Sequence, residues 1–239
     1  MTGSFKFDVA RRNEAKEKEL REWIGEGRIL LGGSTWPGED EVLLHIYRKI
    51  LDSAVHLHLS PSPLLVIAPR HFEKADAIEA NIRKYGFDCV RRSRESKSKD
   101  EVEQWKEKFH CSPSTDDFDY PPVYLADTTG ELMGLYGIAD VIFVGKSLCA
   151  HGSQNMIEPC LCGKPTFVGP YTENFRPVMS DLLASDAIIQ VKDAEELEKR
   201  IVGMFECRDR NELGARARAA VEKRRGVVAK CVGEIREAL

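Results

Sequence analysis

A short segment in the second half of the chain combines residues that could bind a sugar by its hydroxyl groups. It reads Ala-His-Gly-Ser-Gln-Asn-Met-Ile-Glu-Pro over residues 150–159, and its end should begin a helix over 155–162. Glu158 then lies one turn beyond Asn155, on the same helix face. A carboxylate in this place can accept hydrogen bonds from both hydroxyls of a ribose, while amides of the glycine-containing loop contact an adjoining phosphate. The segment predicts a nucleotide site that needs no metal.

Three other turns carry groups that suit an anion. Residues 32–39 read Gly-Gly-Ser-Thr-Trp-Pro-Gly-Glu, which allows close approach of a ligand to helix-starting amides, although a capped strand-to-helix turn explains the same residues. This turn matches neither GxGxxG nor a Walker loop, which disfavours dinucleotide and triphosphate binding. Arg70 presents a five-donor fork to phosphate or carboxylate, with a surface ion pair as the alternative. The Thr-Gly step within residues 127–132 leaves helix-starting amides exposed.

The elements that must position these turns alternate between strands and helices. Runs such as Leu-Leu-Val-Ile-Ala (64–68) are apolar at every position, which is typical of strands covered on both faces. We expect strands at 28–32, 64–69, 88–92, 123–126, 141–144, 165–168 and 187–190. We expect helices at 13–24, 39–55, 73–85, 130–137, 155–162, 175–183, 194–205 and 211–238. The pattern predicts an α/β fold, a single Rossmann-like domain with a doubly wound, mostly parallel sheet that gathers the candidate turns at one edge.

Composition excludes several functional classes. The chain has 239 residues, 42% hydrophobic and 31% charged, so it can form a core and is not a disordered tail. No apolar run approaches the ~18 residues of a membrane helix, and a net charge of −4 does not favour nucleic acid as a partner. An odd number of cysteines, seven, and the lack of an apolar leader core indicate a reducing, cytoplasmic location. Cys160 and Cys162 resemble half of a metal site, but a two-residue helical step turns them apart, so buried thiols are favoured and no metal or cofactor is expected.

The chain is expected to form one domain over residues 1–239. Within it, residues 1–26 lead into the first strand, and residues 210–239 form a long terminal helix. The polar stretch over 94–122 interrupts the alternation of strands and helices, and a mobile surface excursion is favoured there over a functional flap.

Six motifs occur in an order that carries a resemblance to a known family. They read Gly-Ser-Thr-Trp-Pro-Gly-Glu (33–39), Ile-Ala-Pro-Arg-His (67–71), Asp-Thr-Thr-Gly-Glu-Leu-Met (127–133), Phe-Val-Gly-Lys-Ser-Leu (143–148), Asn-Met-Ile-Glu-Pro (155–159) and Gly-Lys-Pro-Thr-Phe-Val-Gly-Pro (163–170). Together they resemble the C-terminal half of the 3-deoxy-D-manno-octulosonic acid (Kdo) transferases, over almost the whole sequence. The resemblance implies the C-terminal half of a GT-B glycosyltransferase that binds CMP-Kdo. Such an enzyme would transfer Kdo to the lipid A precursor in lipopolysaccharide synthesis, with inversion and without a metal at the donor site.

The resemblance also implies roles for individual residues, transferred by their position in the motifs. Arg70 would contact the donor nucleotide, and Glu158 would bind its ribose. The cytidine end would be lined by Thr129, Gly130 and Glu131. The residues beside the phosphate would be Gly152, Ser153 and Asn155. The cleft between the two halves would be faced by Ser34 and Thr35.

The chain departs from the family pattern at two positions. Gln154 stands where a histidine is expected, so an amide replaces the imidazole and this position cannot fill a role that needs a protonated imidazole. Lys146 stands where a glycine is usual, and it would either crowd the donor or add a cation beside the phosphate.

The resemblance places the acceptor site and a glutamate general base on the other half of the enzyme, so no catalytic residue is assigned in these residues. The chain alone is therefore expected to bind CMP-Kdo or CMP and to turn over slowly or not at all. Its expected partners are an acceptor-binding N-terminal GT-B domain and, through that domain, the lipid A precursor. The full-length enzyme would act at the cytoplasmic face of the inner membrane.

Two other functions stay open. The chain could be a GT-B domain for a UDP-sugar, because uridine and cytidine donors share the ribose carboxylate. It could also be a non-catalytic interaction module whose basic terminal helix contacts a partner or anionic lipid. If the other half has been removed, that helix is expected to expose an apolar stripe made of Leu213, Ala217, Val221 and Val228.

Overall fold

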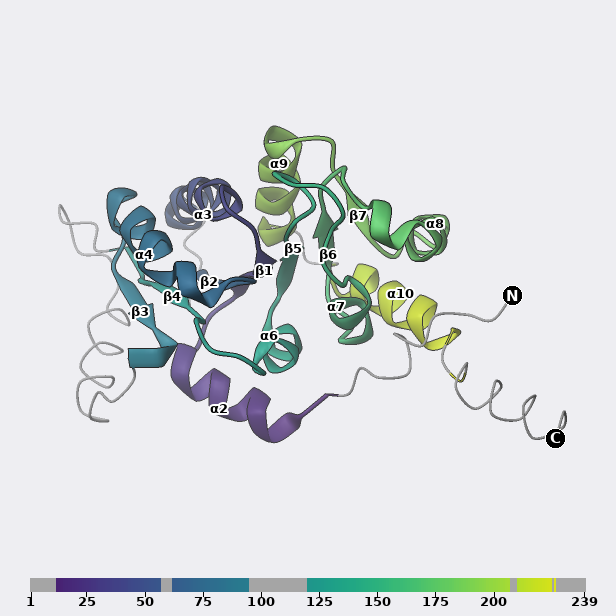
Figure 1. The fold of residues 1–239 in the computed structure, drawn as a ribbon, viewed down its shortest axis with the longest axis horizontal. Helices are drawn as coiled ribbons and strands as arrows, with labels where there is room; N and C mark the ends of the chain where they lie inside the picture. The colour runs from purple at the N-terminus through teal and green to yellow at the C-terminus, as the bar shows by residue number, and fades with distance from the viewer. Residues whose placement is uncertain (1–11, 57–61, 95–119, 207–209, 225, 227–239) are drawn as a thin grey trace, which may run out of the picture.

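One parallel sheet forms the centre of the molecule. The computed structural model describes residues 12–56, 62–94, 120–206, 210–224 and 226. Within these residues, seven strands pair in the order β3-β4-β2-β1-β5-β6-β7, and every pairing is parallel (Figure 1). The strands are β1 (Ile29–Thr35), β2 (Leu64–Pro69), β3 (Cys89–Arg91), β4 (Val123–Leu125), β5 (Val141–Val144), β6 (Thr166–Val168) and β7 (Ile189–Gln190). A strand is present in each of the seven predicted places, although several bounds differ, and the parallel α/β fold is confirmed.

Helices cover both faces of this sheet. The α-helices are α2 (Glu14–Ile24), α3 (Glu39–His56), α4 (Ala75–Lys84), α6 (Leu132–Ile138), α7 (Ile157–Leu161), α8 (Arg176–Ala184), α9 (Ala194–Glu206) and α10 (Arg210–Glu222). The short 3-10 helices are η1 (Phe72–Lys74), η2 (Arg92–Arg94) and η3 (Glu173–Phe175). In Figure 1, α3, α4 and α9 lie on one side of the sheet, and α2, α6, α7 and α10 lie on the other.

Each face of the sheet has its own hydrophobic core. Leu30 points into the core beneath α3, α4 and α9, whereas its neighbours Ile29 and Leu31 point into the core beneath α2, α6 and α7. All three side chains are at most 1% exposed. This alternation explains why the strand sequence is apolar at successive positions, since neither face meets water.

The first strand is longer than the sequence predicts. We expected it to end at Gly32, with Gly33, Ser34 and Thr35 in the following turn, but β1 continues to Thr35 between β2 and β5. Its pairing register with β2 is irregular between Gly33 and Thr35, and Ser34 has a φ of 53°. The two glycines weaken the local preference for a strand, but pairing with both β2 and β5 as far as Gly33, and with β2 at Thr35, extends it.

The order of the strands creates a switch point between β1 and β5. From β1 the chain builds β2, β3 and β4 on one side, then crosses back to place β5 directly against the other side of β1. In an open parallel sheet, ligands bind outside the carboxyl ends of the strands at such a switch point. The turns after β1 and β5 therefore occupy the position where a ligand site is most expected.

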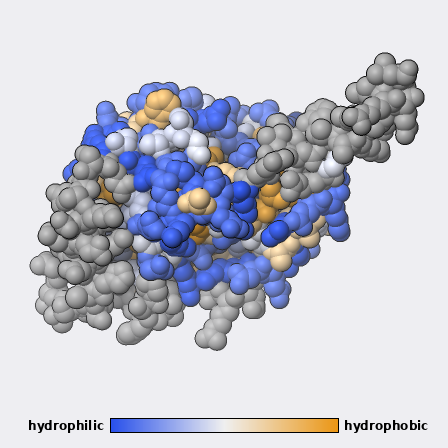
Figure 2. Space-filling view, turned by 90° about the horizontal axis from the view of Figure 1, so that it is seen from below, coloured by the Kyte–Doolittle hydropathy of each residue, from blue (hydrophilic) through white to orange (hydrophobic). Residues whose placement is uncertain are grey.

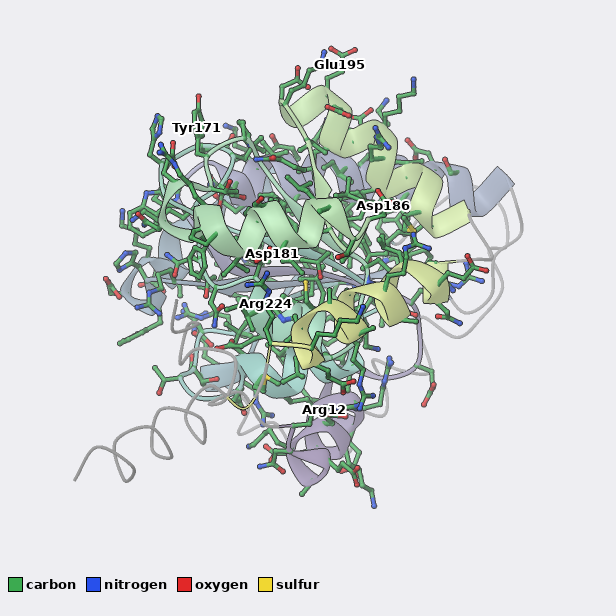
Figure 3. All side chains as sticks on the ribbon, turned by 90° about the vertical axis from the view of Figure 1, so that its right-hand side faces the viewer. Arg12, Tyr171, Asp181, Asp186, Glu195 and Arg224 are labelled. Atoms are coloured by element: carbon green, nitrogen blue, oxygen red, sulfur yellow. The ribbon has the colours of Figure 1, made fainter. Side chains whose placement is uncertain are left out.

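The apolar stripe predicted on the terminal helix is buried, not exposed. Leu213, Ala217 and Val221 are 7%, 0% and 0% exposed, because α10 packs against α7 and α8 of the same chain. Figure 3 shows Arg224, just beyond α10, beside Asp181 of α8, and the two side chains form an ion pair with an N–O distance of 2.5 Å. The prediction of an unpartnered stripe is wrong for these three residues, while Val228 lies outside the described residues.

The described helix α10 ends at Glu222, and residues 227–239 of the predicted terminal helix lie outside the described part of the chain. The predicted surface excursion over 94–122 also falls mostly there, in residues 95–119. The face drawn in Figure 2 is mostly hydrophilic, with small, separate hydrophobic areas. Among the described residues, no helix has both the length and the apolar character needed to span a bilayer.

Candidate functional site

Strained backbone marks the carboxyl ends of β1 and β5. Among the described residues, four that are not glycine have a positive φ, and three of them lie here: Ser34 at 53°, Lys146 at 56° and Ser153 at 59°. Each such residue costs about 1–3 kcal/mol and persists only where surrounding contacts impose it. Their gathering at the switch point indicates a built site.

Backbone hydrogen bonds join these turns into one unit. The Gly145 amide donates to the Gly33 carbonyl at 2.9 Å, which ties the loop after β5 to β1. The Gln154 amide returns to the Gly145 carbonyl at 3.0 Å. A side chain on Gly145 would be impossible, since its Cβ would lie 2.3 Å from the Ser34 carbonyl oxygen. The close approach explains the glycine at this strand end.

Glu39 anchors the same region from inside the protein. Its side chain is fully buried, and its carboxylate accepts the amides of Trp36 at 2.8 Å and Lys146 at 2.9 Å. It also accepts the amides of Ser147 at 3.1 Å and Leu148 at 3.1 Å. The sequence indicates only a carboxylate at the first turn of a helix, and its partners beyond β5 become visible only in the fold. With no access to a ligand, Glu39 has a structural role.

Asn155 and Glu158 form the pair that the sequence predicts. The Asn155 side-chain amide donates to Glu158 at 2.9 Å, and its oxygen accepts the Ile157 amide at 3.1 Å, so Asn155 also opens α7. Burial raises the pKa of the half-buried Glu158 carboxyl, and the hydrogen bond from Asn155 opposes this shift. The cost of burying the Glu158 carboxylate is thus only partly offset by the hydrogen bond from Asn155. Such a carboxylate is suited to accept further hydrogen bonds from ligand hydroxyls.

Tyr136 lies between this pair and β1. Burial, followed by the nearby Glu158 charge, raises the pKa of the Tyr136 phenol well above its usual value. A Cβ on Gly33 would lie 2.6 Å from the phenol oxygen, so the ring packs directly on the β1 backbone. Because α6 contacts both β1 and α7, Tyr136 links the end of β1 to the helix that contains Glu158.

Arg70 meets this region from β2. Its backbone amide donates to the Thr35 carbonyl at 3.0 Å, and its side chain is exposed. Within the described part of the chain, the Arg70 guanidinium makes no ion pair, so the surface ion pair considered as its alternative role is absent there. Ser34 and Thr35, expected to face a cleft, are only 7% and 3% exposed because β1 incorporates them.

The turn after β4 contains both exposed residues and a buried residue that is hydrogen-bonded within the domain. Thr129 and Gly130 are exposed, whereas Glu131 is 8% exposed. Arg92 donates to the Glu131 carboxylate at 3.1 Å, and Thr128 donates to it as well. Burial acts to raise the pKa of Glu131, but these hydrogen bonds outweigh it and lower the pKa. The Glu131 carboxylate is thus engaged inside the domain, which leaves the backbone of Thr129 and Gly130 as the accessible part.

The amides of Gly152 and Ser153 are also engaged within the protein. Glu173 accepts the Gly152 amide at 2.9 Å and contacts His151 Nδ1 at 2.8 Å. The Ser153 amide donates to the Lys146 carbonyl at 2.7 Å. A phosphate could reach the Gly152 amide only by displacing the exposed Glu173 carboxylate. Sequence reasoning missed this competitor, because Glu173 lies 21 residues farther along the chain.

Two aromatic side chains and one cationic side chain also contact one another at this edge of the sheet. The sequence did not indicate that these side chains would form one group. The Lys146 ammonium lies 4.7 Å from the centre of the Trp36 ring, and Trp36 packs edge-on against His71 at 4.8 Å. The turns after β1, β2 and β5 each contribute one of these residues. The sequence signal was the lysine directly after Gly145 at a strand end.

The two cysteines considered as half of a metal site are buried thiols, as predicted. Cys160 and Cys162 are 0% and 6% exposed, and burial raises the pKa of Cys160 to about 12. In the described residues, no group of three or more His, Cys, Asp or Glu side chains is arranged to bind a metal ion.

This fold is that of the C-terminal half of a GT-B glycosyltransferase, in which a parallel sheet places its turns at one ligand-binding edge. The resemblance stated from the motifs is also confirmed, because the chain is similar in sequence to 3-deoxy-D-manno-octulosonic acid transferases. The transferase from Haemophilus influenzae is 29% identical over 233 residues, which are 95% of this chain and 49% of that protein. The transferase from Bordetella pertussis is 34% identical over 196 residues, which are 81% of this chain and 41% of that protein.

A solved structure extends this likeness to the fold. The C-terminal CMP-Kdo binding domain of WaaA from Acinetobacter baumannii superposes with a TM-score of 0.68 at 22% identity, covering 87% of this chain and 99% of that domain. No protein-family model matches the chain. The chain spans about half the length, or less, of the curated relatives named here.

Proposed function

We propose that the chain is the donor-binding domain of an inverting glycosyltransferase that transfers Kdo from CMP-Kdo to the lipid A precursor. The observation that carries the proposal is the half-buried Glu158 carboxylate, oriented by Asn155 at the carboxyl edge of the sheet. The similarity to Kdo transferases over most of the chain supports CMP-Kdo as the donor.

The described side chains suggest a division of roles at this edge. Glu158 accepts the two ribose hydroxyls of the cytidylate, and Arg70, which has no ionic partner among the described residues, contacts its phosphate. The exposed backbone of Thr129 and Gly130 is available to the base. Asn155 positions Glu158, and Ser153 lies in the loop beside the phosphate.

In such a transfer, the acceptor hydroxyl attacks the anomeric carbon, and the bond from that carbon to the CMP phosphate oxygen breaks. The acceptor proton passes to a general base, and the departing CMP carries the negative charge. A guanidinium at the phosphate stabilises that charge as it develops. We assign the base to an acceptor-binding N-terminal domain, which would bind the lipid A precursor at the cytoplasmic face of the inner membrane.

Calorimetric titration of the 239-residue chain with CMP tests the site. Glu158→Ala should weaken CMP binding about tenfold or more, because it removes a charged acceptor of two ligand hydrogen bonds. Glu212→Ala is the matched control, since this exposed carboxylate lies on α10, away from the strand ends. Equal CMP affinity in the wild type and Glu158→Ala, or no binding by either, would contradict the proposal.

The same titration with UDP decides between donors. A cytidylate site should bind CMP more tightly than UDP, because UDP carries a different base for the turn after β4 and a second phosphate. Tighter binding of UDP would instead assign the chain to a UDP-sugar transferase. The interaction-module alternative is less favoured, because the apolar residues of α10 are buried against α7 and α8 and are not available to a partner.

A further inference from the structure

Lys146 has an unusual conformation at the switch point. Its φ of 56° lies in the left-handed region, which glycine adopts without strain and a lysine does not. Its amide donates to the buried Glu39 carboxylate at 2.9 Å, and its carbonyl accepts the Ser153 amide at 2.7 Å. The backbone of this residue is therefore fixed on both sides by the protein.

The side chain of Lys146 is oriented as well. Its ammonium lies over the face of Trp36, 4.7 Å from the ring centre, in a cation–π contact that limits its rotamers. Among the described residues, no carboxylate forms an ion pair with it, in contrast to Lys16, which reaches Glu19 at 2.7 Å. The result is an oriented ammonium without an anionic partner, at the carboxyl edge of the sheet.

The fold thus holds a charged side chain at position 146, where a glycine would fit without backbone strain. We propose that Lys146 is a specificity-determining residue that binds an anionic oxygen of the nucleotide-sugar donor, either the phosphate or the carboxylate of an acidic sugar. The proposal rests on the proposed function, because it assumes that a sugar nucleotide occupies this edge. It requires the ammonium to lie within reach of the ligand that Arg70 and Glu158 contact. In support, backbone hydrogen bonds from Arg70 to Thr35 and from Gly145 to Gly33 bring the turns after β1, β2 and β5 to the same edge of the sheet.

The test replaces Lys146 with the residue that its backbone favours. Lys146→Gly should melt at the same temperature as the wild type or higher, because it relieves the strain at a positive φ. It should nevertheless bind about tenfold more weakly the ligand that carries the anionic oxygen: CMP if that oxygen belongs to the phosphate, and a CMP-sugar with a carboxylate if it belongs to the sugar, because the substitution removes a charge-assisted contact. Lys146→Met, which has an uncharged side chain of nearly the same length that can still pack on Trp36, should show the same loss without the gain in stability.

Asp186→Gly is the matched control. Asp186 also has a positive φ, 47°, but it is exposed and precedes β7, at the amino edge of the sheet. Figure 3 shows it well apart from Tyr171, whose amide donates to the Ser147 carbonyl beside the site. This variant should relieve similar strain and leave CMP affinity unchanged.

Three ligands distinguish the source of the anionic oxygen: cytidine has neither anion, CMP has the phosphate, and CMP-N-acetylneuraminic acid has both the phosphate and a sugar carboxylate. An equal loss for the last two in Lys146→Gly supports the phosphate. A loss confined to CMP-N-acetylneuraminic acid supports the carboxylate. Unchanged affinity for both, with wild-type binding intact, overturns the role of Lys146 alone. Failure of the wild type to bind CMP overturns the proposed function, and this inference with it.

Discussion

At the scale of single residues, the raised pKa of Glu158 makes the stability of the free domain depend on pH. Because the folded pKa exceeds the unfolded one, the associated stabilisation is full below the usual carboxyl pKa and is lost as pH rises through the raised value. Glu158→Gln keeps an acceptor for Asn155 but removes this charge. At pH 7 and without ligand, we expect the variant to melt about 2 °C higher than the wild type, and near pH 4 the two curves should coincide. Thermal melts from pH 4 to pH 8 measure this difference.

Glu212→Gln provides the comparison, because it neutralises an exposed carboxylate on α10. Its melting curve should follow that of the wild type throughout. A lower melting temperature for Glu158→Gln at pH 7 would mean that the Glu158 charge stabilises the unliganded fold, against the argument from burial.

At the scale of elements, Glu39 connects the start of α3 to the loop after β5. Glu39→Gln replaces one carboxylate oxygen with an amide nitrogen, which cannot accept a hydrogen bond. Some of the backbone amides of residues 146–148 that donate to Glu39 then lose their acceptor. We expect unfolding to become easier by about 3 kcal/mol, measured from urea denaturation. Glu41→Gln, in the same first turn but half-exposed, should change stability by less than about 0.5 kcal/mol. Similar effects of both substitutions would show that the Glu39 contacts contribute little.

At the scale of the whole molecule, α10 closes the fold by packing on α7, the helix that contains Glu158. The contact depends on Gly214, where a Cβ would lie 2.0 Å from the Gly163 carbonyl oxygen. Gly214→Ala must displace the helix, and we expect it to destabilise the domain by about 2 kcal/mol. Chemical denaturation provides the measurement.

Gly203→Ala is the corresponding change in a helix without such a contact. A Cβ at this position of α9 meets nothing within 4 Å, so the better helix propensity of alanine should stabilise the domain by up to about 1 kcal/mol. If Gly214→Ala also stabilised the protein, the close packing of α10 on α7 would not be a feature of the molecule in solution.

The order of strands and helices could be predicted because local patterns encode it. Runs such as Leu64–Ala68 are apolar at successive positions, and the parallel sheet then follows from their alternation with helices. Placing Arg70 and Asn155 at one edge needed nothing more, since parallel strands end on the same side. The proximity of Asn155 to Glu158 was predictable from local spacing, because Glu158 lies three positions beyond Asn155, in the first turn of α7.

The partners of the polar side chains were decided by the tertiary structure alone. Glu39 meets the Lys146 amide across 107 residues, and Glu131 meets Arg92 across 39. Whether the stripe that contains Ala217 is exposed depended on how α10 packs against α7. A local pattern states which face of a helix is apolar and where a strand begins. It contains no information on which distant group will desolvate a carboxylate or supply its donors, because those contacts arise only when the sheet order brings separate turns together.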